Sequence, residues 1–368
     1  MSGPGIGVRW RRLDDLDPAE VEAWAGLGEE APGAHPFTMP QFVLPAARWL
    51  TPEQPPGVLS VERRTGAGVE LLGIGCFDER SPGLFVPLRH LRGYRTPHSF
   101  RGDMLHRAGA ADEVAAALLE FARARGLRAL AFHTVPADCP VMAALRRAGG
   151  AETGWYPRGS FERAELRLDA GQAPRLRASV VKDLRRRQRR LAERGEVAFR
   201  ILQGDAADAD AAERHLRLEH AGWKGDAGSS MLATQAQSGF FRELAARFRE
   251  TGNMVFSEIL CDGEVIASTS NILVGDTLHA FKCGWDPGFA QYSPGRLNEL
   301  WLLEAIRETW PALACFDGNA SDDSYMARLL PDRGRYQTGA FAATRTGRGL
   351  QRAARWLRPL AYRFGDDG

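Results

Sequence analysis

The sequence has 368 residues, 44% hydrophobic and 26% charged, a composition of ordinary globular proteins that excludes collagen-like, disordered and coiled-coil chains. At about 150 residues per domain, this length predicts about two domains. Its 48 Lys and Arg against 46 Asp and Glu leave a formal charge of +2, so no chain-wide field drives binding to nucleic acid or membrane.

The cysteines and the apolar segments indicate a cellular compartment. The five cysteines form no Cys-x-x-Cys pair, which argues against a disulfide framework and against structural zinc. The amino terminus lacks an apolar leader, and no run reaches the roughly 18 apolar residues of a spanning helix. We therefore expect a cytoplasmic protein.

The first half of the chain predicts alternating strands and helices. Strands are expected at 8–13, 58–63, 69–77, 84–88, 129–133, 152–156 and 161–168. Helices are expected at 18–27, 40–50, 111–125 and 141–148.

The second half repeats nearly the same order of elements. Strands are expected at 197–202, 254–261, 264–274, 277–285, 314–317 and 336–343, and helices at 180–194, 206–221, 238–250 and 296–309, with a short helix before the last strand. Asp262-Gly263 and Gly275-Asp276 are two-residue hairpin turns, so the middle strands form an antiparallel meander. The repeated order predicts two copies of one α/β unit, joined by a linker at 169–178 that contains Gly and Pro.

This arrangement resembles the GNAT acyltransferase superfamily. The doubled form resembles the branch that contains the CelD/BcsL-like acetyltransferases, the Fem-type aminoacyltransferases and GNAT-type bacterial ceramide synthases. The matching stretches are HPFTMPQFV at 35–43, SVVKDLRRRQRRLAERGEVAF at 179–199, LEHAGWKGDAG at 218–228, FKCGWDPGFAQYSPGRL at 281–297, and FDGNASDD with MARLLPDR within 316–333.

The resemblance implies an α/β (α+β) fold of tandem duplicated GNAT-like units, each a mixed, mostly antiparallel sheet flanked by helices. It implies a degenerate domain at 1–168, a catalytic domain at 179–344 and a basic amphipathic tail at 345–368.

A coenzyme A site is expected at Ser293-Pro294-Gly295-Arg296, which follows a strand and opens a helix. Unsatisfied amides and the macrodipole at a helix start favour a diphosphate, and Arg296 adds a charged fork. Tyr292 belongs to the same segment. The resemblance further implies that the backbone amide near Gly284 polarises the thioester carbonyl. The chain departs from the family in having one glycine here where many GNAT enzymes have two.

Catalytic candidates lie on the strand before this loop and after the next strand. Strict alternation places Thr277, His279, Phe281, Cys283 and Trp285 on one face and Lys282, Gly284 and Asp286 on the other. Lys282 and Asp286 match family positions and could orient the acceptor amine or remove its proton; a structural ion pair is the alternative. His279 is a second candidate base, with a satisfied strand histidine as the alternative.

Asp317 ends an apolar strand, where it is either functional or a helix N-cap. The resemblance implies that Tyr325 protonates the leaving thiolate.

An acceptor site is expected in the segment 215–225, which the resemblance places over the acceptor. Its candidates are Glu219, His220, Trp223 and Lys224, with a core role as the alternative for Trp223. His215 and Glu219 have metal-ligand spacing, but no third ligand follows at a telling distance, so no metal site is expected.

Two basic segments have alternative partners. The helix at 180–194 carries seven basic residues: Lys182, Arg185, Arg186, Arg187, Arg189, Arg190 and Arg194. The partners expected for this face are the 3′-phosphate of coenzyme A, transfer RNA or anionic lipid, and a face that contacts only solvent is the alternative. The pattern of the tail at 345–368 is typical of an interfacial helix that contacts anionic lipid at the inner face of the inner membrane. The alternative is a helix that packs on its own domain.

The sequence therefore predicts an N-acyltransferase that moves an acyl group from acyl-coenzyme A to a primary amine. The acceptor is a long-chain lipid amine, as in bacterial ceramide synthesis, or an amino sugar of an envelope polysaccharide. One alternative is an aminoacyl-transfer RNA dependent peptidyl transferase of the Fem type, which the near-zero net charge disfavours because nucleic-acid binding depends on phosphate contacts. Another is a non-catalytic protein that binds acyl-coenzyme A or a partner protein.

Overall fold

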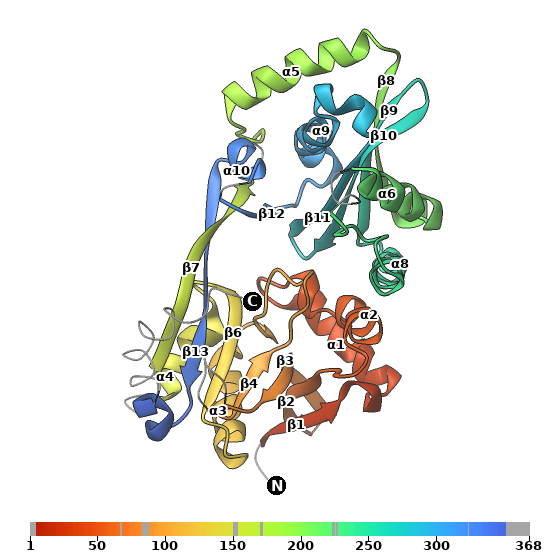
Figure 1. The fold of residues 1–368 in the computed structure, drawn as a ribbon. Coiled ribbons are helices and arrows are strands. Elements are labelled where there is room, and N and C mark those ends of the chain that lie inside the picture. Colours follow the sequence, from red (N-terminus) through yellow and green to blue (C-terminus); the bar gives the residue numbers. More distant parts are fainter. Residues whose placement is uncertain are drawn as a thin grey trace. The chain divides into compact units, whose positions relative to one another are not determined.

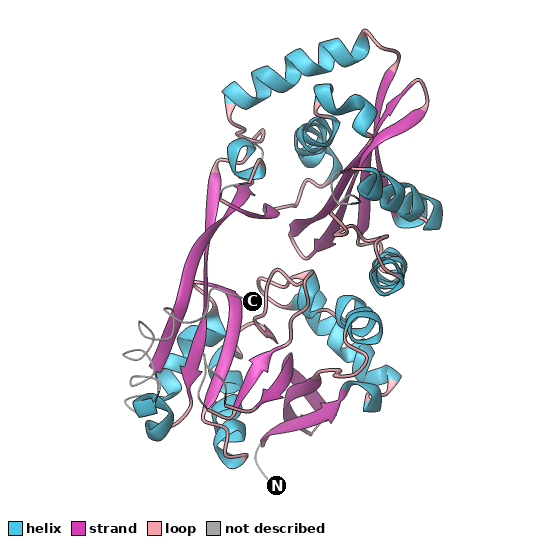
Figure 2. Ribbon diagram, in the orientation of Figure 1, coloured by secondary structure: helices cyan, strands magenta, loops and turns pink. Residues whose placement is uncertain are grey.

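The computed structural model describes residues 5–350 except 67, 83–87, 150–153, 170–171, 223–224, 226 and 323. The chain forms two compact units. Unit 1 holds the described residues up to Pro40, those from 54 to 161 and those from 335 onward; unit 2 holds 41–53 and 162–334. In each unit, helices pack on a β-sheet (Figure 2).

Unit 1 is built on a sheet of the order β1-β2-β3-β4-β6-β13. Its strands are β1 (Ile6–Arg12), β2 (Gly57–Thr65), β3 (Gly68–Arg80), β4 (His90–Gly93), the short β5 (Leu105–His106) paired to β3, and β6 (Ala129–Pro136). Its helices are α1 (Pro18–Glu30), α3 (Ala111–Ala124) and α4 (Pro140–Gly149). β4 and β6 are parallel, whereas β1, β2 and β3 form an antiparallel meander.

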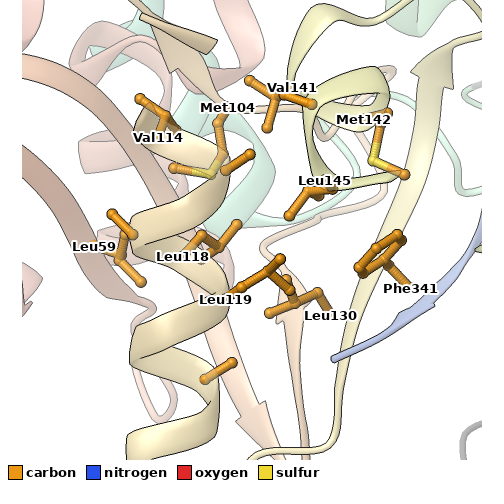
Figure 3. Packing of buried hydrophobic residues seen from close by; sticks show 14 of the residues in the cluster. Leu59, Met104, Val114, Leu118, Leu119, Leu130, Val141, Met142, Leu145 and Phe341 are labelled. Atoms are coloured by element: carbon orange, nitrogen blue, oxygen red, sulfur yellow. The ribbon is translucent and has the colours of Figure 1, made fainter. Parts of the chain in front are cut away.

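The core of unit 1 packs α3 and α4 against this sheet. Leu118 and Leu119 of α3 and Leu145 of α4 meet Leu130 of β6 with almost no exposed surface, and Phe341 adds a ring from near the end of the chain (Figure 3). Burying a side chain of this size contributes about 1.5–3 kcal/mol.

Unit 2 is built on a sheet of the order β7-β12-β11-β10-β9-β8. Its strands include β8 (Val197–Gln203), β9 (Met254–Cys261), β10 (Glu264–Val274), β11 (Thr277–Trp285) and β12 (Cys315–Ser321). Its helices are α2 (Pro40–Leu50), α5 (Ala178–Ala192), α6 (Ala209–Ala221), α8 (Gln235–Glu250), α9 (Pro294–Thr309) and α10 (Met326–Leu329).

The sheet of unit 2 is covered on both faces. α9 packs on β9 and β10 from one side, and α6 and α8 pack from the other (Figure 1). Successive residues of β11 show this, because Cys283 contacts Gly295 of α9 while Gly284 contacts Glu219 of α6. β11 and β12 are parallel, as β4 and β6 are in unit 1, so the two units share their element order and strand directions.

The two units exchange their last strands. β7 (Gly154–Arg167), the last strand of the first copy, pairs through its end with β12 of unit 2. β13 (Asp332–Ala342), the last strand of the second copy, pairs with β6 of unit 1. The unit bounds therefore differ from the linear ranges expected from the sequence, and most of α2 also belongs to unit 2.

Most predicted elements are present, and the three strands of the meander 254–285 have the predicted bounds. At the Asp262-Gly263 turn both residues have positive φ, 51° and 85°, as the predicted hairpin requires. The expected break between 156 and 161 was wrong: β7 is continuous, and the exposure of its middle residues lets it include Pro157. Most of the strand expected at 84–88 and of the tail lies outside the described residues. No helix in the described part of the chain is long and apolar enough to cross a membrane.

Candidate functional site

A cavity of about 500 Å³ opens in unit 2 where β11 and β12 separate. The two strands pair only from Thr277 to His279 and from Cys315 to Asp317. Next, Asn319, whose φ of 46° is left-handed, turns its side-chain amide to the carbonyl of Ala280 at 2.7 Å, in place of a main-chain bond. The cavity is lined by residues of β10, β11 and β12 near this point, by residues of α9 and the segment before it, and by two residues at the start of α10. They are Thr269, Ser270, Asn271, Ala280, Phe281, Lys282, Cys283, Trp285, Ala290, Ser293, Pro294, Gly295, Arg296, Glu299, Gly318, Asn319, Ala320, Tyr325 and Met326.

A β-bulge at Phe281 reorients the cavity end of β11. Ser270 pairs with Lys282 but Asn271 pairs with Ala280, so Phe281 is the additional residue. Ala280 and Trp285 pack in the core cluster that includes α9, whereas the ring of Phe281 stacks on Phe241 of α8 at 6.3 Å. The strict alternation expected along this strand was therefore wrong.

The start of α9 forms one wall of the cavity. Ser293 has a left-handed φ of 53°, and Pro294 occupies the first helical position. The amides of Gly295 and Arg296 then have no carbonyl acceptor within the helix. Gly295 lies so close to β11 that an added Cβ would sit 2.9 Å from the sulfur of Cys283. The structure thus brings Ser293, Gly295 and Arg296 together at the cavity, as the sequence suggested.

Two other predicted donor-site residues lie elsewhere. The α carbon of Gly284 faces α6, where an added Cβ would overlap the backbone of Leu218 and Glu219. Tyr292 is buried in the core cluster, its ring 6.3 Å from that of Phe289. Neither residue lines the cavity.

A hydroxyl and a carboxylate meet inside the cavity. The Tyr325 hydroxyl donates a hydrogen bond to Oε1 of Glu299, a residue of α9 that is 5% exposed. Tyr325 itself is 38% exposed, but its hydroxyl end is buried beside Glu299 and the thiol of Cys283. Burial and the charge of Glu299 raise the pKa of Tyr325 well above its usual range.

Lys282 and Asp286 have separate surroundings. Lys282 lines the cavity, with its ammonium 5.2 Å from the centre of the Phe281 ring. Asp286 accepts a hydrogen bond from the amide of Gly288 at 2.8 Å and so caps the 3-10 helix Pro287–Tyr292; it does not line the cavity.

His279 and Asp317 lie together but outside the cavity lining. Asp317 accepts hydrogen bonds from Arg163 at 3.1 and 3.3 Å and from the amide of Asn319 at 2.8 Å. The Nδ1 atom of His279 is 3.6 Å from Asp317. This buried ion cluster anchors β12 between β11 and β7.

The predicted acceptor residues lie on and after α6. The buried carboxylate of Glu219 accepts a hydrogen bond from the amide of Met231 at 2.7 Å, and Nδ1 of His220 lies 2.8 Å from the hydroxyl of Ser230. His215 is buried between Ser268 and Ser270. Trp223 and Lys224 lie outside the described residues. In the described part of the chain, no group of three or more His, Cys, Asp and Glu side chains is arranged to hold a metal.

Sequence reasoning missed Glu299 and Asn319. Glu299 follows Gly295 by four residues, so the two side-chain positions share one face of α9, and this spacing was an available signal. Asn319 lies within β12 directly after its buried residues 316–318, and asparagine is among the few residues that adopt a left-handed φ readily.

One comparison with known proteins concerns the segment that holds this cavity. Residues 178–325 match the family model of the acetyltransferase (GNAT) domain. The matched segment contains every lining residue of the cavity except Met326. The GNAT resemblance drawn from the motifs is thus confirmed for residues 178–325. No curated protein has a detectable sequence match to this chain.

Three solved structures share the fold across both units. The C-terminal domain of a protein described as lysylphosphatidylglycerol synthetase, from Agrobacterium fabrum, is 12% identical, with 92% of this chain and 95% of that chain covered and a TM-score of 0.55. FemX is 11% identical, with 90% and 98% covered and a TM-score of 0.54. L-PGS from Bacillus licheniformis is 13% identical, with 91% and 96% covered and a TM-score of 0.51. At such identities the likeness concerns the fold.

Proposed function

We propose that this protein is an N-acyltransferase that moves an acyl group from acyl-coenzyme A to a primary amine, with unit 2 as the catalytic copy. The observation that carries the proposal is the start of α9 on the cavity. The amides of Gly295 and Arg296, which have no acceptor within the helix, and the Arg296 guanidinium suit a diphosphate, because a helix start offers both donors and a positive dipole end.

The separation of β11 from β12 supports the placement of the thioester. Past Ala280, the edge of β11 that faces β12 pairs with no strand among the described residues, so its main-chain amides can donate to a polarised carbonyl. One such donor in an oxyanion site is worth about 3 kcal/mol of the barrier. Lys282 supplies a positive charge on the same wall.

For the acceptor we propose an amine of a long-chain lipid or an amino sugar. The lipid version includes contact of the basic tail with anionic membrane at the inner face of the inner membrane. Co-sedimentation of the full chain with vesicles of anionic and of zwitterionic lipid tests that contact. If the protein binds neither kind of vesicle, the proposed membrane contact is contradicted.

The fold similarity to FemX and L-PGS favours a second candidate, transfer of an aminoacyl group from transfer RNA. α5 offers transfer RNA a basic face, since Lys182, Arg189 and Arg190 are exposed and make no ion pair with any described residue. Such binding would weaken steeply with salt, because counterions are released from the phosphates.

Thermal unfolding with coenzyme A, acetyl-coenzyme A and a long-chain acyl-coenzyme A tests the leading proposal. Ligand at 100 times its Kd stabilises the native state by about 2.7 kcal/mol, so the midpoint should rise. Thiol release on addition of amines then tests turnover. No shift with any coenzyme, together with salt-sensitive binding of aminoacyl-transfer RNA, would favour the second candidate. A coenzyme A shift without turnover on any amine would indicate a binding protein.

A further inference from the structure

We propose that Asn271 makes this protein select an acyl group that carries a hydroxyl close to its thioester carbonyl. Asn271 belongs to β10 and lines the inner end of the cavity, beside Ala280 of β11. The inference rests on the proposed function and specifies the thioester as a hydroxyacyl-coenzyme A.

The side chain of Asn271 faces the cavity. On the same strand, Ser268 and Ser270 contact His215 of α6, so strand alternation places Asn271 on the opposite face of the sheet, which α9 covers (Figure 1). The start of α9 lines the cavity from that face. The register partner of Asn271 is Ala280, which adds only a methyl group beside the carboxamide.

The carboxamide oxygen of Asn271 lacks a donor among the described residues. Asn271 is only 1% exposed, and its nitrogen donates a hydrogen bond to Oγ1 of Thr269 at 3.2 Å. Its oxygen accepts no hydrogen bond from any described residue. Buried side-chain oxygens usually have a partner, because an unsatisfied one is costly. A ligand group that donates a hydrogen bond would satisfy it.

A second carboxamide lies across Ala280, at the gap between β11 and β12. Asn319 directs its nitrogen to the carbonyl of Ala280 at 2.7 Å, and its buried oxygen has no partner in the part of the chain that the structure describes. This gap is where the proposed function places the thioester, and the pantetheine arm of every acyl-coenzyme A carries amide N–H groups. The oxygen of Asn319 therefore suits an amide of that arm, and the oxygen of Asn271, one strand further in, suits the acyl group.

The order of residues along β11 agrees with this division. The start of α9 lies against the end of the strand, since an added Cβ on Gly295 would be 2.9 Å from the sulfur of Cys283 and 3.0 Å from the ring of Trp285. Ala280 precedes both residues on β11. A thioester whose diphosphate binds at Gly295 and whose carbonyl meets the amides of β11 past Ala280 therefore extends its acyl group toward Asn271.

The charge of the cavity favours a hydroxyl over an amino group. Among the described lining residues, Lys282 and Arg296 are positively charged and Glu299 is negatively charged. The carboxylate of Glu299 already accepts a hydrogen bond from the hydroxyl of Tyr325. A protonated amino group would add to the excess of positive charge, whereas a neutral hydroxyl donates its hydrogen bond without that cost.

Calorimetric titration with thioesters that differ by one group tests the proposal. The ligands are propionyl-, lactoyl- and alanyl-coenzyme A, butyryl- and 3-hydroxybutyryl-coenzyme A, and coenzyme A itself. In at least one pair the hydroxylated thioester should bind about 5–150-fold more tightly than its plain counterpart, because the plain acyl group leaves the buried oxygen of Asn271 without a donor. Lactoyl-coenzyme A should also bind more tightly than alanyl-coenzyme A.

Three variants assign the preference to Asn271. Asn271→Ala should reduce the difference within each pair to less than twofold and leave the Kd of coenzyme A within threefold of the parent. Asn319→Gly, which tolerates the left-handed backbone, should weaken all the ligands alike and keep the hydroxyl preference. Asn298→Ala is the matched control for loss of a buried asparagine, because Asn298 of α9 donates to the carbonyl of Ser257 at 2.7 Å and does not line the cavity.

A further variant covers the case in which Asn271→Ala does not fold. Ala280→Val places two more carbon atoms beside the carboxamide, and it should also remove the hydroxyl preference while coenzyme A still binds.

Several outcomes would overturn the proposal. These are equal binding within both pairs, a preference that survives in Asn271→Ala, tighter binding of alanyl- than of lactoyl-coenzyme A, and an equal loss of affinity for coenzyme A itself in Asn271→Ala. The last result would assign Asn271 to the pantetheine arm. If neither coenzyme A nor any thioester binds to the parent protein, the proposed acyltransferase is contradicted, and this inference fails with it.

Discussion

The carboxylate of Asp317 lies 3.1 Å from the guanidinium of Arg163, and both side chains are almost completely buried, with 3% and 4% exposed. Burial alone would raise the pKa of Asp317, but Arg163, His279 and the Asn319 amide outweigh burial and hold it well below its usual range. Asp317 is therefore an ionised partner in a structural cluster, although its position in the sequence also suggested a catalytic residue.

Replacement of Asp317 by Asn should destabilise the protein by about 3–5 kcal/mol, because the buried charge of Arg163 loses its partner. Urea unfolding measures this change. Asp322→Asn, at an exposed aspartate close by, is the control and should cost far less. Full stability of Asp317→Asn combined with lost turnover would instead assign Asp317 to catalysis.

Replacement of Gly284 by Ala should destabilise unit 2 by about 1–3 kcal/mol, because the new methyl group overlaps the backbone of α6. Gly7→Ala, in strand β1, adds a methyl group that meets nothing within 4 Å and is the matched control. Coenzyme A binding by the folded fraction should not change. Selective loss of that binding at full stability would restore Gly284 to the thioester site.

Replacement of Arg296 by Gln should weaken coenzyme A binding by about 10–100-fold, since a hydrogen bond to a charged group contributes about 1.5–3 kcal/mol. Calorimetric titration gives the Kd. Arg328→Gln is the control, because Arg328 is exposed on α10 and does not line the cavity. Unaltered affinity in Arg296→Gln would show that the diphosphate is held elsewhere.

Replacement of His133 by Leu should reduce the loss of stability in acid. Burial, followed by the charge of Arg95, lowers the pKa of His133 from 6.5 to about 4, with Asp103 opposing and Arg92 and His35 adding to the shift. The unfolded chain binds this proton at higher pH than the native protein does. Stability from the neutral ring is therefore complete above pH 6.5 and is lost as pH falls toward 4, by about 3 kcal/mol.

Urea unfolding of the parent and His133→Leu between pH 7.5 and 4.5 checks this prediction. The slope of unfolding free energy against pH should be smaller in the variant. Identical slopes in the two proteins would contradict it.

The parts of the fold that the sequence predicted are those encoded locally. The turn at Asp262-Gly263 and the helix start near Ser293-Pro294-Gly295 depend on residues a few positions apart. The turn lies where expected, and α9 begins at Pro294, two residues before the expected start at 296. The bulge at Phe281 could not be read in this way, because it is defined by the pairing of β11 with β10.

The contact between Glu299 and Tyr325 depends on tertiary structure. The residues are 26 positions apart, and their meeting requires α9 and the segment after β12 to converge on one cavity. The sequence could nominate Tyr325 by resemblance, but its carboxylate partner emerged only when the fold brought α9 alongside it.

The exchanged strands constrain how this protein can be made. Synthesis of β6 is complete at Pro136, but synthesis of its neighbour β13 is complete only at Ala342, more than 200 positions later. The sheet of the first unit must therefore keep one edge open until more than 200 further residues have been synthesised. A gene cut between the two copies would give each fragment a final strand that belongs to the other.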